Sequence, residues 1–336
     1  MQRVRRLLFP FLAVVVAVLL CASDGVAGYR VRVVSYQGVN YLFVKELADY
    51  YGLGFRMSGD SCALRGKAHS ISFEKDKREV TVDGVLVNLS HPAAYWQGTL
   101  IVSERDVRLL LDPILRPAAL PRASVRTIVL DPGHGGKDQG TNGRGRYLEK
   151  DLCLRVARKT ASILRQQGFV VYLTRSLDST LELEQRPAIA ARVRGDLYVS
   201  LHMNTAGNAA VKGIETFLLA PYGTSSTYDS KVWKGARRGN QFDKCNARLA
   251  FNLHGGMVAA TGGEDRGVKH ANFLVLRDVS CPAVLVEMGF LSNASEERQL
   301  GTSAYQDKVA RGLAAGVVTY AKDVAGPAAG KAGGKK

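Results

Sequence analysis

Long hydrophobic stretches are nearly absent from this 336-residue sequence: only one, at the N-terminus, is apolar enough to consider as a membrane segment. A protein with several membrane spans is therefore excluded. The five cysteines show no C-x-x-C spacing, which argues against a cysteine-based zinc site. Apolar residues make up 46% and charged residues 23% of the chain, so a wholly disordered or fibrous protein is excluded too. At about 150 residues per domain, the length predicts two domains.

The single hydrophobic stretch has the features of an export signal. Three arginines stand among the first six residues, an apolar run follows over 7–20, and Gly25-Val26-Ala27 offers small residues where a signal peptidase cleaves. The run is too short to span a bilayer of about 30 Å comfortably, although an uncleaved membrane anchor is the alternative. We predict a signal peptide over 1–27 and an exported mature chain from about Gly28. Such a chain would be periplasmic or extracellular at the cell wall, with no stable membrane insertion.

Acidic residues are too few to balance the basic ones: 30 Asp and Glu stand against 46 Lys and Arg, a formal charge of +16. A basic surface favours anionic partners such as nucleic acid, acidic lipid or an anionic wall polymer. No aromatic and basic motif typical of nucleic-acid recognition is present and export contradicts such a role, so we expect no nucleic-acid partner. In an oxidising compartment Cys62, Cys153, Cys245 and Cys281 could pair, but the sequence leaves their pairing open.

A Pro- and Ala-rich stretch at 116–123 divides the mature chain into two segments. Residues 28–115 hold short apolar runs separated by Gly, Asp, Asn and Ser, which predicts a small strand-rich α+β module. Its apolar runs include 31–34, 41–44 and 80–87, and its expected helices are 47–54 and 102–111. This layout resembles the small N-terminal domain of copper amine oxidases. We carry over no ligand or activity from that resemblance and expect a role in placement or folding.

Residues 124–323 alternate between strand and helix patterns. Strands are expected at 125–131, 169–174, 197–202, 213–219, 273–276 and 283–287, and helices from about 152 to before Gly168 and over 184–194, 241–260 and 303–321. Strands separated by helices predict an α/β domain, with a layered sheet flanked by helices. Residues 324–336 are expected to form a disordered basic tail.

Four polar residues stand at the ends of these expected elements. His134 follows the first strand in Asp-Pro-Gly-His-Gly-Gly, and Glu149 begins the first long helix. His202 ends the third strand and Glu287 ends the last. In an open α/β sheet, ligands bind beyond the carboxyl ends of the strands, where three of these four residues would lie.

These residue types point to metal-assisted hydrolysis. Two imidazoles and a carboxylate are the ligand set of a catalytic zinc ion that keeps one position for water. Zinc lowers the pKa of bound water from about 15.7 to about 7, which makes hydroxide available near neutral pH. A carboxylate off the metal must take the proton of the water and pass it to the leaving amine. Glu287 suits this task, because burial at the end of an apolar strand would raise its pKa.

Each residue alone has a simpler explanation. His134 could be a solvated loop residue, Glu149 a helix-start carboxylate favoured by the helix dipole, and His202 a hydrogen-bonded strand end. Glu287 is the hardest to explain in this way, since an unpaired buried carboxylate is costly. The four residues together, in their local motifs, indicate a catalytic site.

The segment from about 125 to 321 resembles the type 3 family of zinc-dependent N-acetylmuramoyl-L-alanine amidases. The resemblance rests on the Asp-Pro-Gly-His-Gly-Gly turn, the Glu-Lys-Asp helix start, Tyr-Leu-Thr-Arg at 172–175, Ser-Leu-His-Met-Asn at 200–204, Arg-Gly-Val-Lys at 266–269 and the stretch 282–293. It implies that His134, Glu149 and His202 hold Zn²⁺ and that Glu287 is the catalytic carboxylate. It also implies a peptidoglycan substrate, cut at the amide between N-acetylmuramic acid and the L-alanine of the stem peptide.

Two features depart from the family pattern. Met203 stands where relatives usually have a small residue, which would narrow the pocket. Residues 220–240 are longer than most α/β connections of about 2–6 residues. Some relatives carry a zinc-blocking helix here, but the Gly, Pro and Ser content of this stretch favours a flexible lid or a substrate-contact loop. Four further residues are expected to be structural: His254 and His270 as ordinary polar residues, and Arg175 and Arg186 in ion pairs.

Two other functions compete with the amidase. One is a catalytically inactive wall-binding protein, against which the complete ligand set argues. The other is a zinc peptidase that acts within the stem peptide. The sequence leaves open whether a protein activator is required.

Overall fold

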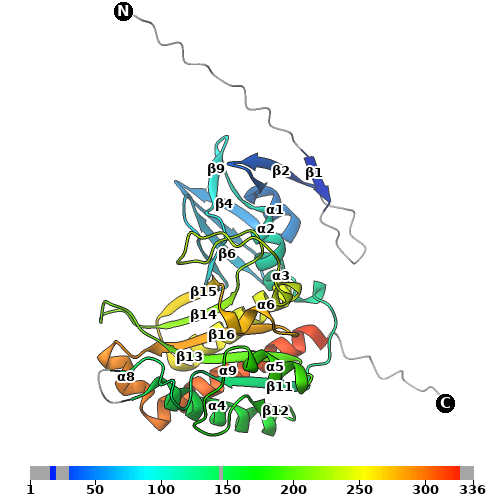
Figure 1. Cartoon of the computed structure of the whole chain (residues 1–336). Helices are drawn as coiled ribbons and strands as arrows, with labels where there is room; N and C mark the ends of the chain where they lie inside the picture. The colour runs from blue at the N-terminus through cyan, green and yellow to red at the C-terminus, as the bar shows by residue number, and fades with distance from the viewer. Residues whose placement is uncertain (1–15, 20–29, 144–146, 326–336) are drawn as a thin grey trace, which may run out of the picture.

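Two β-sheets organise the chain in a computed structural model that describes residues 16–19, 30–143 and 147–325 (Figure 1). The smaller sheet has five strands in the order β1-β2-β3-β10-β9, and every pair is antiparallel. Its strands are β1 Val16–Leu19, β2 Arg30–Tyr36, β3 Val39–Phe43, β9 Ala94–Trp96 and β10 Thr99–Ser103.

The larger sheet has 11 strands in the order β12-β11-β13-β16-β14-β15-β8-β7-β6-β5-β4. Six come from the C-terminal segment: β11 Thr127–Pro132, β12 Val170–Leu173, β13 Leu197–Asn204, β14 Ile214–Leu219, β15 Asp265–Ala271 and β16 Ala283–Phe290. Five come from the N-terminal segment: β4 Gly54–Ser58, β5 Ser61–Arg65, β6 Ser70–Glu74, β7 Glu79–Val82 and β8 Val85–Asn88. In the C-terminal part all pairs are parallel except β14 with β16.

The two parts of the larger sheet meet where β8 lies parallel to β15, with Val87 opposite Val268. Nδ2 of the buried Asn88 donates to the carbonyl of Val268 at 3.2 Å, and the carboxylate of Asp265 accepts from the amide of Leu86 at 2.9 Å. One continuous cluster of buried apolar side chains extends through both segments. The N-terminal segment is therefore attached along a sheet edge and through the core. Its division from the rest of the chain at 116–123 stays a prediction.

Helices cover both faces of the parallel strands. On one face lie α4 Glu149–Gln166, α6 Asp243–Thr261 and α9 Ser303–Ala325, with α9 against both other helices. On the other lie α5 Gln185–Arg192 and α7 Leu274–Arg277. Because side chains alternate along a strand, Ile128 and Leu130 of β11 enter the first core and Val129 the second. The structure thus confirms the expected α/β sheet flanked by helices.

The remaining helical segments are short or lie in the N-terminal part. They are α1 Val44–Tyr51, α2 Glu104–Asp106, a π-helical turn Val107–Leu111, α3 Asp112–Leu115, α8 Ala294–Leu300 and two 3₁₀ turns, Pro117–Ala119 and Arg238–Phe242. The small strand-rich α+β character expected for 28–115 is present. The helix expected at 102–111 begins later, because β10 continues to Ser103, whose hydroxyl then caps α2 by accepting from the amide of Asp106.

Two expectations for the C-terminal segment are wrong. The strand expected at 273–276 is instead the short helix α7, where Arg277 closes the turn by donating to the carbonyl of Asn272. A four-residue apolar run has no measurable period, so it does not distinguish the two structures. β15 was not expected, because its Lys269 and His270 are polar; both are buried in the sheet. The last helix, α9, continues to Ala325.

Part of the expected N-terminal signal falls within the described residues. β1 lies inside 1–27 and pairs with β2, with Val18 opposite Val31. The other residues of the expected signal peptide, and 326–336 of the expected tail, lie outside the described residues. No described helix is long and apolar enough to cross a membrane. Cys62, Cys153, Cys245 and Cys281 are free thiols in this structure.

Candidate metal centre

His134, Glu149 and His202 converge at the carboxyl end of the parallel strands. Each offers one ligand atom, and these atoms all lie within 4.8 Å of one another. Nε2 of His134 is 3.1 Å and Nδ1 of His202 is 2.9 Å from Oε1 of Glu149. The structure therefore brings together three residues that are far apart in the sequence, as the motifs predict.

The ring of His134 is oriented by a neighbouring carboxylate. Oδ2 of Asp138 lies 2.8 Å from Nδ1 of His134, so that Nε2 is the nitrogen that faces Glu149. A carboxylate on the second ring nitrogen is the usual contact that fixes a metal-binding imidazole. The backbone of His134 has a φ of 59°. Arg186 donates to its carbonyl at 2.9 Å and holds this turn in place.

Asp131 anchors the strand that leads into this turn. Its fully buried carboxylate accepts hydrogen bonds from Thr174 at 2.5 Å, Tyr198 at 2.6 Å, Ser200 at 2.8 Å and Arg186 at 2.8 Å. Burial alone would favour the neutral acid, but the Arg186 guanidinium and the hydroxyl donors lower the pKa of Asp131. Asp131 therefore carries a charge, which neutralises a buried Arg186.

Glu149 is the first residue of α4 and is only 3% exposed. Its Oε2 accepts from the amide of Thr141 at 2.8 Å, and its Oε1 accepts from the amide of Met203 at 3.0 Å. Burial opposes the ionised form, but hydrogen bonds from His134 and His202 lower the pKa of Glu149 well below its usual value. The cluster thus presents one carboxylate and two imidazoles.

Two glycines let the backbone pack directly against this cluster. A Cβ at Gly133 would lie 2.3 Å from Cε1 of the His202 ring. A Cβ at Gly140, whose φ is +67°, would lie 2.6 Å from both Oε2 of Glu149 and Cδ2 of His134. Any larger residue at either position would displace a ligand.

The donor set fits a zinc ion. Two imidazole nitrogens and one ionised carboxylate, with a cavity on the open side, are what a catalytic zinc requires. The three residues line a cavity of about 680 Å³ together with Glu287. Met203, a residue only 2% exposed, also lines this cavity; that it narrows the pocket stays a prediction.

Glu287 lies in β16, opposite His202 on one side and opposite Glu215 on the other. Its Oε2 is buried and has no hydrogen-bond partner among the described residues. Burial first, and then the carboxylates of Glu149 and Glu215, raise the pKa of Glu287 well above its usual value. A carboxyl group with a raised pKa takes up a proton more readily than an ordinary glutamate does.

Glu215 was missed at the sequence level. It accepts hydrogen bonds from Asn204 at 2.8 Å, Tyr228 at 2.7 Å, Arg266 at 2.9 Å and Lys269 at 2.6 Å. Burial opposes its charge, but Lys269 lowers the pKa of Glu215. The signal was present, because Glu215 is the one charged residue of an otherwise uncharged strand, Ile214–Leu219.

Four residues outside the cluster were expected to have structural roles. Arg186 pairs with Asp131, and His254 is held between Thr216 at 3.0 Å and Asp265 at 2.9 Å. His270 is buried, which lowers its pKa to about 4. Arg175 is the exception to the expected ion pair. Within the described part of the chain it donates to the backbone carbonyls of Pro132, Gly133, Lys150 and Leu177.

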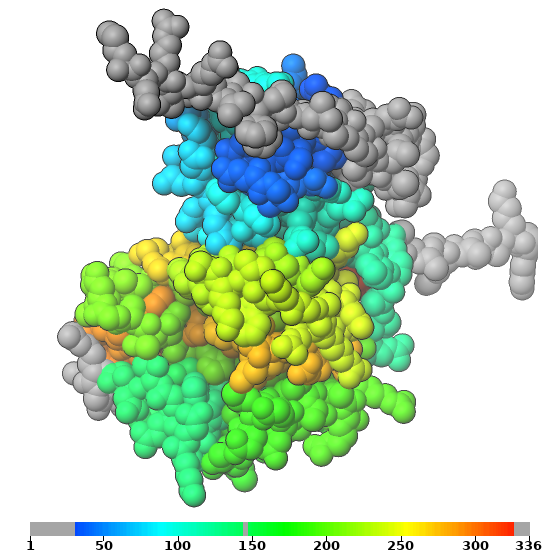
Figure 2. Space-filling view, turned by 45° about the horizontal axis from the view of Figure 1, so that its top comes forward, coloured from blue at the N-terminus to red at the C-terminus, as the bar shows by residue number. Residues whose placement is uncertain are grey.

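The loop over 220–240 folds back on itself beside the site. The amide of Gly223 donates to the carbonyl of Trp233 at 3.0 Å, and Ser225 forms an isolated bridge with Val232. Arg105 of α2 donates to the carbonyl of Tyr222, so the loop is tied to the N-terminal segment, against which it lies in yellow-green in Figure 2. Within residues 220–240 the first helical turn is the 3₁₀ turn that begins at Arg238. Its role as a lid or contact loop stays a prediction.

A family model described as N-acetylmuramoyl-L-alanine amidase matches residues 128–319, more than half of the chain. The chain belongs to this family. It is 33% identical over 229 residues to the N-acetylmuramoyl-L-alanine amidase AmiA of Escherichia coli (strain K12), an alignment that covers 61% of this chain and 79% of that protein. The family model does not extend over the N-terminal module, and the resemblance of that module to copper amine oxidases is not borne out.

Solved structures of the family have the same fold. An N-acetylmuramoyl-L-alanine amidase from Clostridium difficile 630 is 32% identical, with a TM-score of 0.50 and coverage of 59% of this chain and 97% of that one. The amidase AmiC2 of Nostoc punctiforme is 31% identical, with a TM-score of 0.50 and coverage of 59% and 98%. The residues matched by the family model, 128–319, contain the His134, Glu149 and His202 cluster.

Proposed function

We propose that this protein is an exported, zinc-dependent amidase that hydrolyses the amide between N-acetylmuramic acid and L-alanine in peptidoglycan. One observation carries the proposal. Ligand atoms of His134, Glu149 and His202 lie within 4.8 Å of one another, and Glu287, on the adjacent strand, lines the same cavity. Membership of the amidase family supports the substrate, and the basic net charge suits an anionic wall.

The metal would be held by Nε2 of His134, a carboxylate oxygen of Glu149 and Nδ1 of His202. Zinc in such a site supplies Lewis acidity, which polarises a carbonyl and activates water near neutral pH. The protein keeps the three donors in place with Asp138 on the ring of His134 and with backbone amides on Glu149. These contacts spare the ligands from reorganising when the ion binds.

Glu287 would move the protons. Glu287 lines the cavity beside the metal cluster, and its Oε2 has no hydrogen-bond partner among the described residues, so no other group competes for its carboxylate proton. Its raised pKa favours uptake of that proton. The resulting carboxylic acid can then deliver the proton to the nitrogen of the leaving alanine, which completes hydrolysis.

Export would place the enzyme where its substrate is. The arginines, the apolar run and the small residues of 1–27 support cleavage before Gly28. Intact-mass measurement of the protein recovered from the cell envelope should give a chain that begins near Gly28. A full-length chain retained in the membrane fraction would favour the uncleaved anchor.

The activity is tested on purified peptidoglycan with the zinc-loaded protein. Mass analysis of the fragments should show free stem peptides that begin with L-alanine; cleavage within the stem peptide would identify a peptidase instead. Glu287→Gln should lower kcat by about 10²–10⁴-fold and leave the zinc content at one ion per chain. The matched control is Glu182→Gln, which changes an exposed glutamate and should keep full activity. A wild-type protein that binds zinc and releases no fragments would support the wall-binding alternative.

A further inference from the structure

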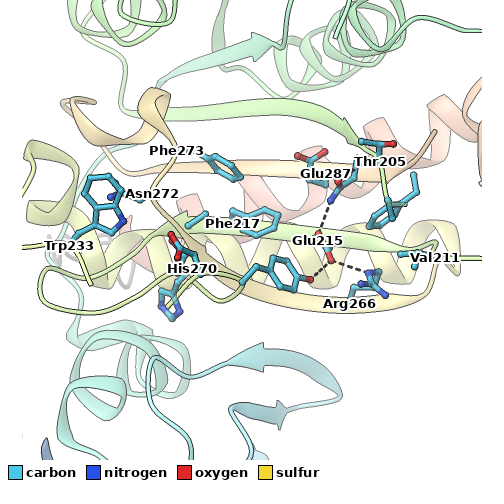
Figure 3. Close-up of a pocket in the computed structure, with 17 residues that line it drawn as sticks. Thr205, Val211, Glu215, Phe217, Trp233, Arg266, His270, Asn272, Phe273 and Glu287 are labelled. Carbon is cyan, nitrogen blue, oxygen red and sulfur yellow. Dashed lines mark hydrogen bonds and ion pairs between the residues drawn. The ribbon is translucent and has the colours of Figure 1, made fainter. Parts of the chain in front are cut away.

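A second cavity lies beside Glu287, and the loop over 220–240 forms part of its wall. The cavity has a volume of about 650 Å³, and Glu287 lines both it and the cavity of the metal cluster. Figure 3 shows Trp233 of the loop and Glu287 of β16 among its lining residues. The loop contributes four of these residues: Ser226, Tyr228, Asp229 and Trp233. The position of the loop therefore determines the shape of the space next to the carboxyl group that would move the protons.

The first arm of the loop, residues 220–228, is bound to β15 at two points. At its start, the amide of Ala220 donates to the carbonyl of Ala271 at 2.9 Å. Further along, the amide of Thr227 donates to the carbonyl of His270 at 2.8 Å, and the amide of His270 donates to the hydroxyl of Thr227 at 2.9 Å. The stretch between these two points meets the N-terminal segment.

Arg105 of α2 is the main contact of the N-terminal segment with this stretch. Its guanidinium donates to the carbonyl of Tyr222 and lies 5.9 Å from the centre of the Tyr222 ring. It also packs against Gly223, because a Cβ at that position would lie 3.1 Å from Nη1 of Arg105. A second arginine, Arg78, makes a longer contact, with its Nη1 3.5 Å from the carbonyl of Ser226. The N-terminal segment thus holds the backbone of the loop between its two points on β15.

Arg105 stands on a helix that is itself fixed in the N-terminal segment. The next residue, Asp106, is buried. Its carboxylate accepts from the amides of Ser90 at 2.6 Å and His91 at 3.1 Å and from the hydroxyl of Ser103 at 2.6 Å. A donor on a helix that is held in this way positions its acceptor more precisely than a donor on a mobile loop does.

The first arm in turn holds the residues that line the cavity. The amide of Gly223 donates to the carbonyl of Trp233 at 3.0 Å. Tyr228, the last residue of the arm, donates to Glu215 at 2.7 Å, and Glu215 lies opposite Glu287 in the sheet. A displacement of the arm at Gly223 would therefore also move Trp233 and Tyr228, which both line the cavity.

From these contacts we infer that the N-terminal segment positions the wall of the cavity beside Glu287, with Arg105 as the positioning residue. Arg105 keeps the loop over 220–240 ordered before the substrate binds, so the substrate does not have to order it. The N-terminal segment then takes part in the reaction, besides any role in placement or folding. The kinetic consequence rests on the proposed function, whereas the ordering of the loop does not.

Arg105→Ala removes the contact and should loosen the loop without unfolding the protein, because the side chain of Arg105 is only half-buried. Hydrogen–deuterium exchange of the zinc-loaded protein should become about three- to tenfold faster in peptides from 221–236. In a Trp96→Phe background Trp233 is the only tryptophan of the chain, so its fluorescence reports on the loop alone. Acrylamide should quench that fluorescence more strongly in Arg105→Ala.

Two further variants show whether the effect comes from the contact with the loop. Arg108→Ala is the matched control, because Arg108 follows Arg105 by three residues, is exposed and pairs with Glu104 at 3.4 Å. It should leave the exchange of the loop unchanged. Arg105→Lys keeps a cationic donor for the carbonyl of Tyr222 and should restore most of the protection that Arg105→Ala loses, since a single hydrogen bond does not need the fork of a guanidinium.

The kinetic consequence is measured with a soluble muropeptide as substrate. Arg105→Ala should raise KM about two- to tenfold, because the substrate then has to order the loop. Because Glu287 is held in β16 and not in the loop, kcat should change by less than about twofold, and the zinc content should stay at one ion per chain. Arg105→Lys should bring KM back towards the value of the wild type.

The outcomes separate this positioning role from the amidase activity itself. Unchanged exchange over 221–236 in Arg105→Ala, or an equal increase in Arg108→Ala, would overturn the role of Arg105. Faster exchange with unchanged KM would overturn the link between the order of the loop and the reaction. Because exchange and quenching are measured without substrate, failure of the proposed hydrolysis would appear only in the fragment analysis.

Discussion

Replacing Asp131 by asparagine should destabilise the protein and loosen the metal cluster together. The carboxylate is fully buried and accepts from Arg186 at 2.8 Å and from three hydroxyl groups. The substitution leaves the buried Arg186 guanidinium without its counter-charge, which typically costs about 3–5 kcal/mol. For about 300 ordered residues this loss corresponds to a fall in Tm of about 5–8 °C. Since Arg186 also donates to the carbonyl of His134, zinc affinity should fall as well.

Calorimetry of the zinc-free protein measures the stability effect without the contribution of metal binding. Asp307→Asn is the matched control, because Asp307 pairs with Lys159 at the surface and such pairs contribute about 0–1 kcal/mol. If Asp131→Asn lowered Tm no more than this control, the role of Asp131 as the counter-charge of the buried Arg186 would be refuted.

The loss of stability in Asp131→Asn should depend on pH in one direction only. The pKa of Asp131 is below its unfolded value of about 3.9, so the stability it contributes is fully present above that pH and is lost as the pH falls towards the folded pKa. The difference in stability between the wild type and Asp131→Asn should therefore be constant from pH 5 to 8 and shrink below about pH 4. A difference that grew on acidification would contradict the assignment.

Two substitutions test how the metal cluster is supported. Gly140→Ala places a Cβ 2.6 Å from both Glu149 and His134, so the zinc content after dialysis should fall while the far-ultraviolet circular dichroism is retained; full zinc retention would show that the ligands can move aside. Asp138→Asn removes the carboxylate that orients His134 and should weaken zinc binding about 10–100-fold in competition with a chelator, whereas unchanged affinity would make Asp138 a mere surface residue.

The sequence was sufficient for the metal cluster because each ligand belongs to a local motif. Asp-Pro-Gly-His-Gly-Gly brings glycines to the positions where the backbone must pass close to a ligand, and the structure places Gly133 against His202. Glu149 lies in the first turn of α4, where a carboxylate is favoured. The end of β13 carries His202 and β16 carries Glu287, in register with each other. Parallel strands bring such ends to one edge of a sheet, so the order of motifs was enough to predict a shared site.

Local sequence patterns did not predict the structure where the burial of a polar residue depends on partners far away in the sequence. β15 contains Lys269 and His270, whose polarity conceals a buried strand; Lys269 is tolerated there only because Glu215 and Tyr228 bond to it. Arg175 was expected in an ion pair, but the buried carboxylate of Asp131 pairs with Arg186. Arg175 holds backbone carbonyls instead.

By itself the sequence predicted the alternation of strands and helices and the four residues of the candidate site, since these depend on residue type and short-range spacing. Only the tertiary structure decided that β14 enters the sheet antiparallel, between β16 and β15, and that β8 of the N-terminal segment extends the same sheet. That strand order sets Glu215 beside Glu287, and both line a second cavity of about 650 Å³. Strand order is fixed by packing and hydrogen bonds between residues remote in sequence, which no local period encodes.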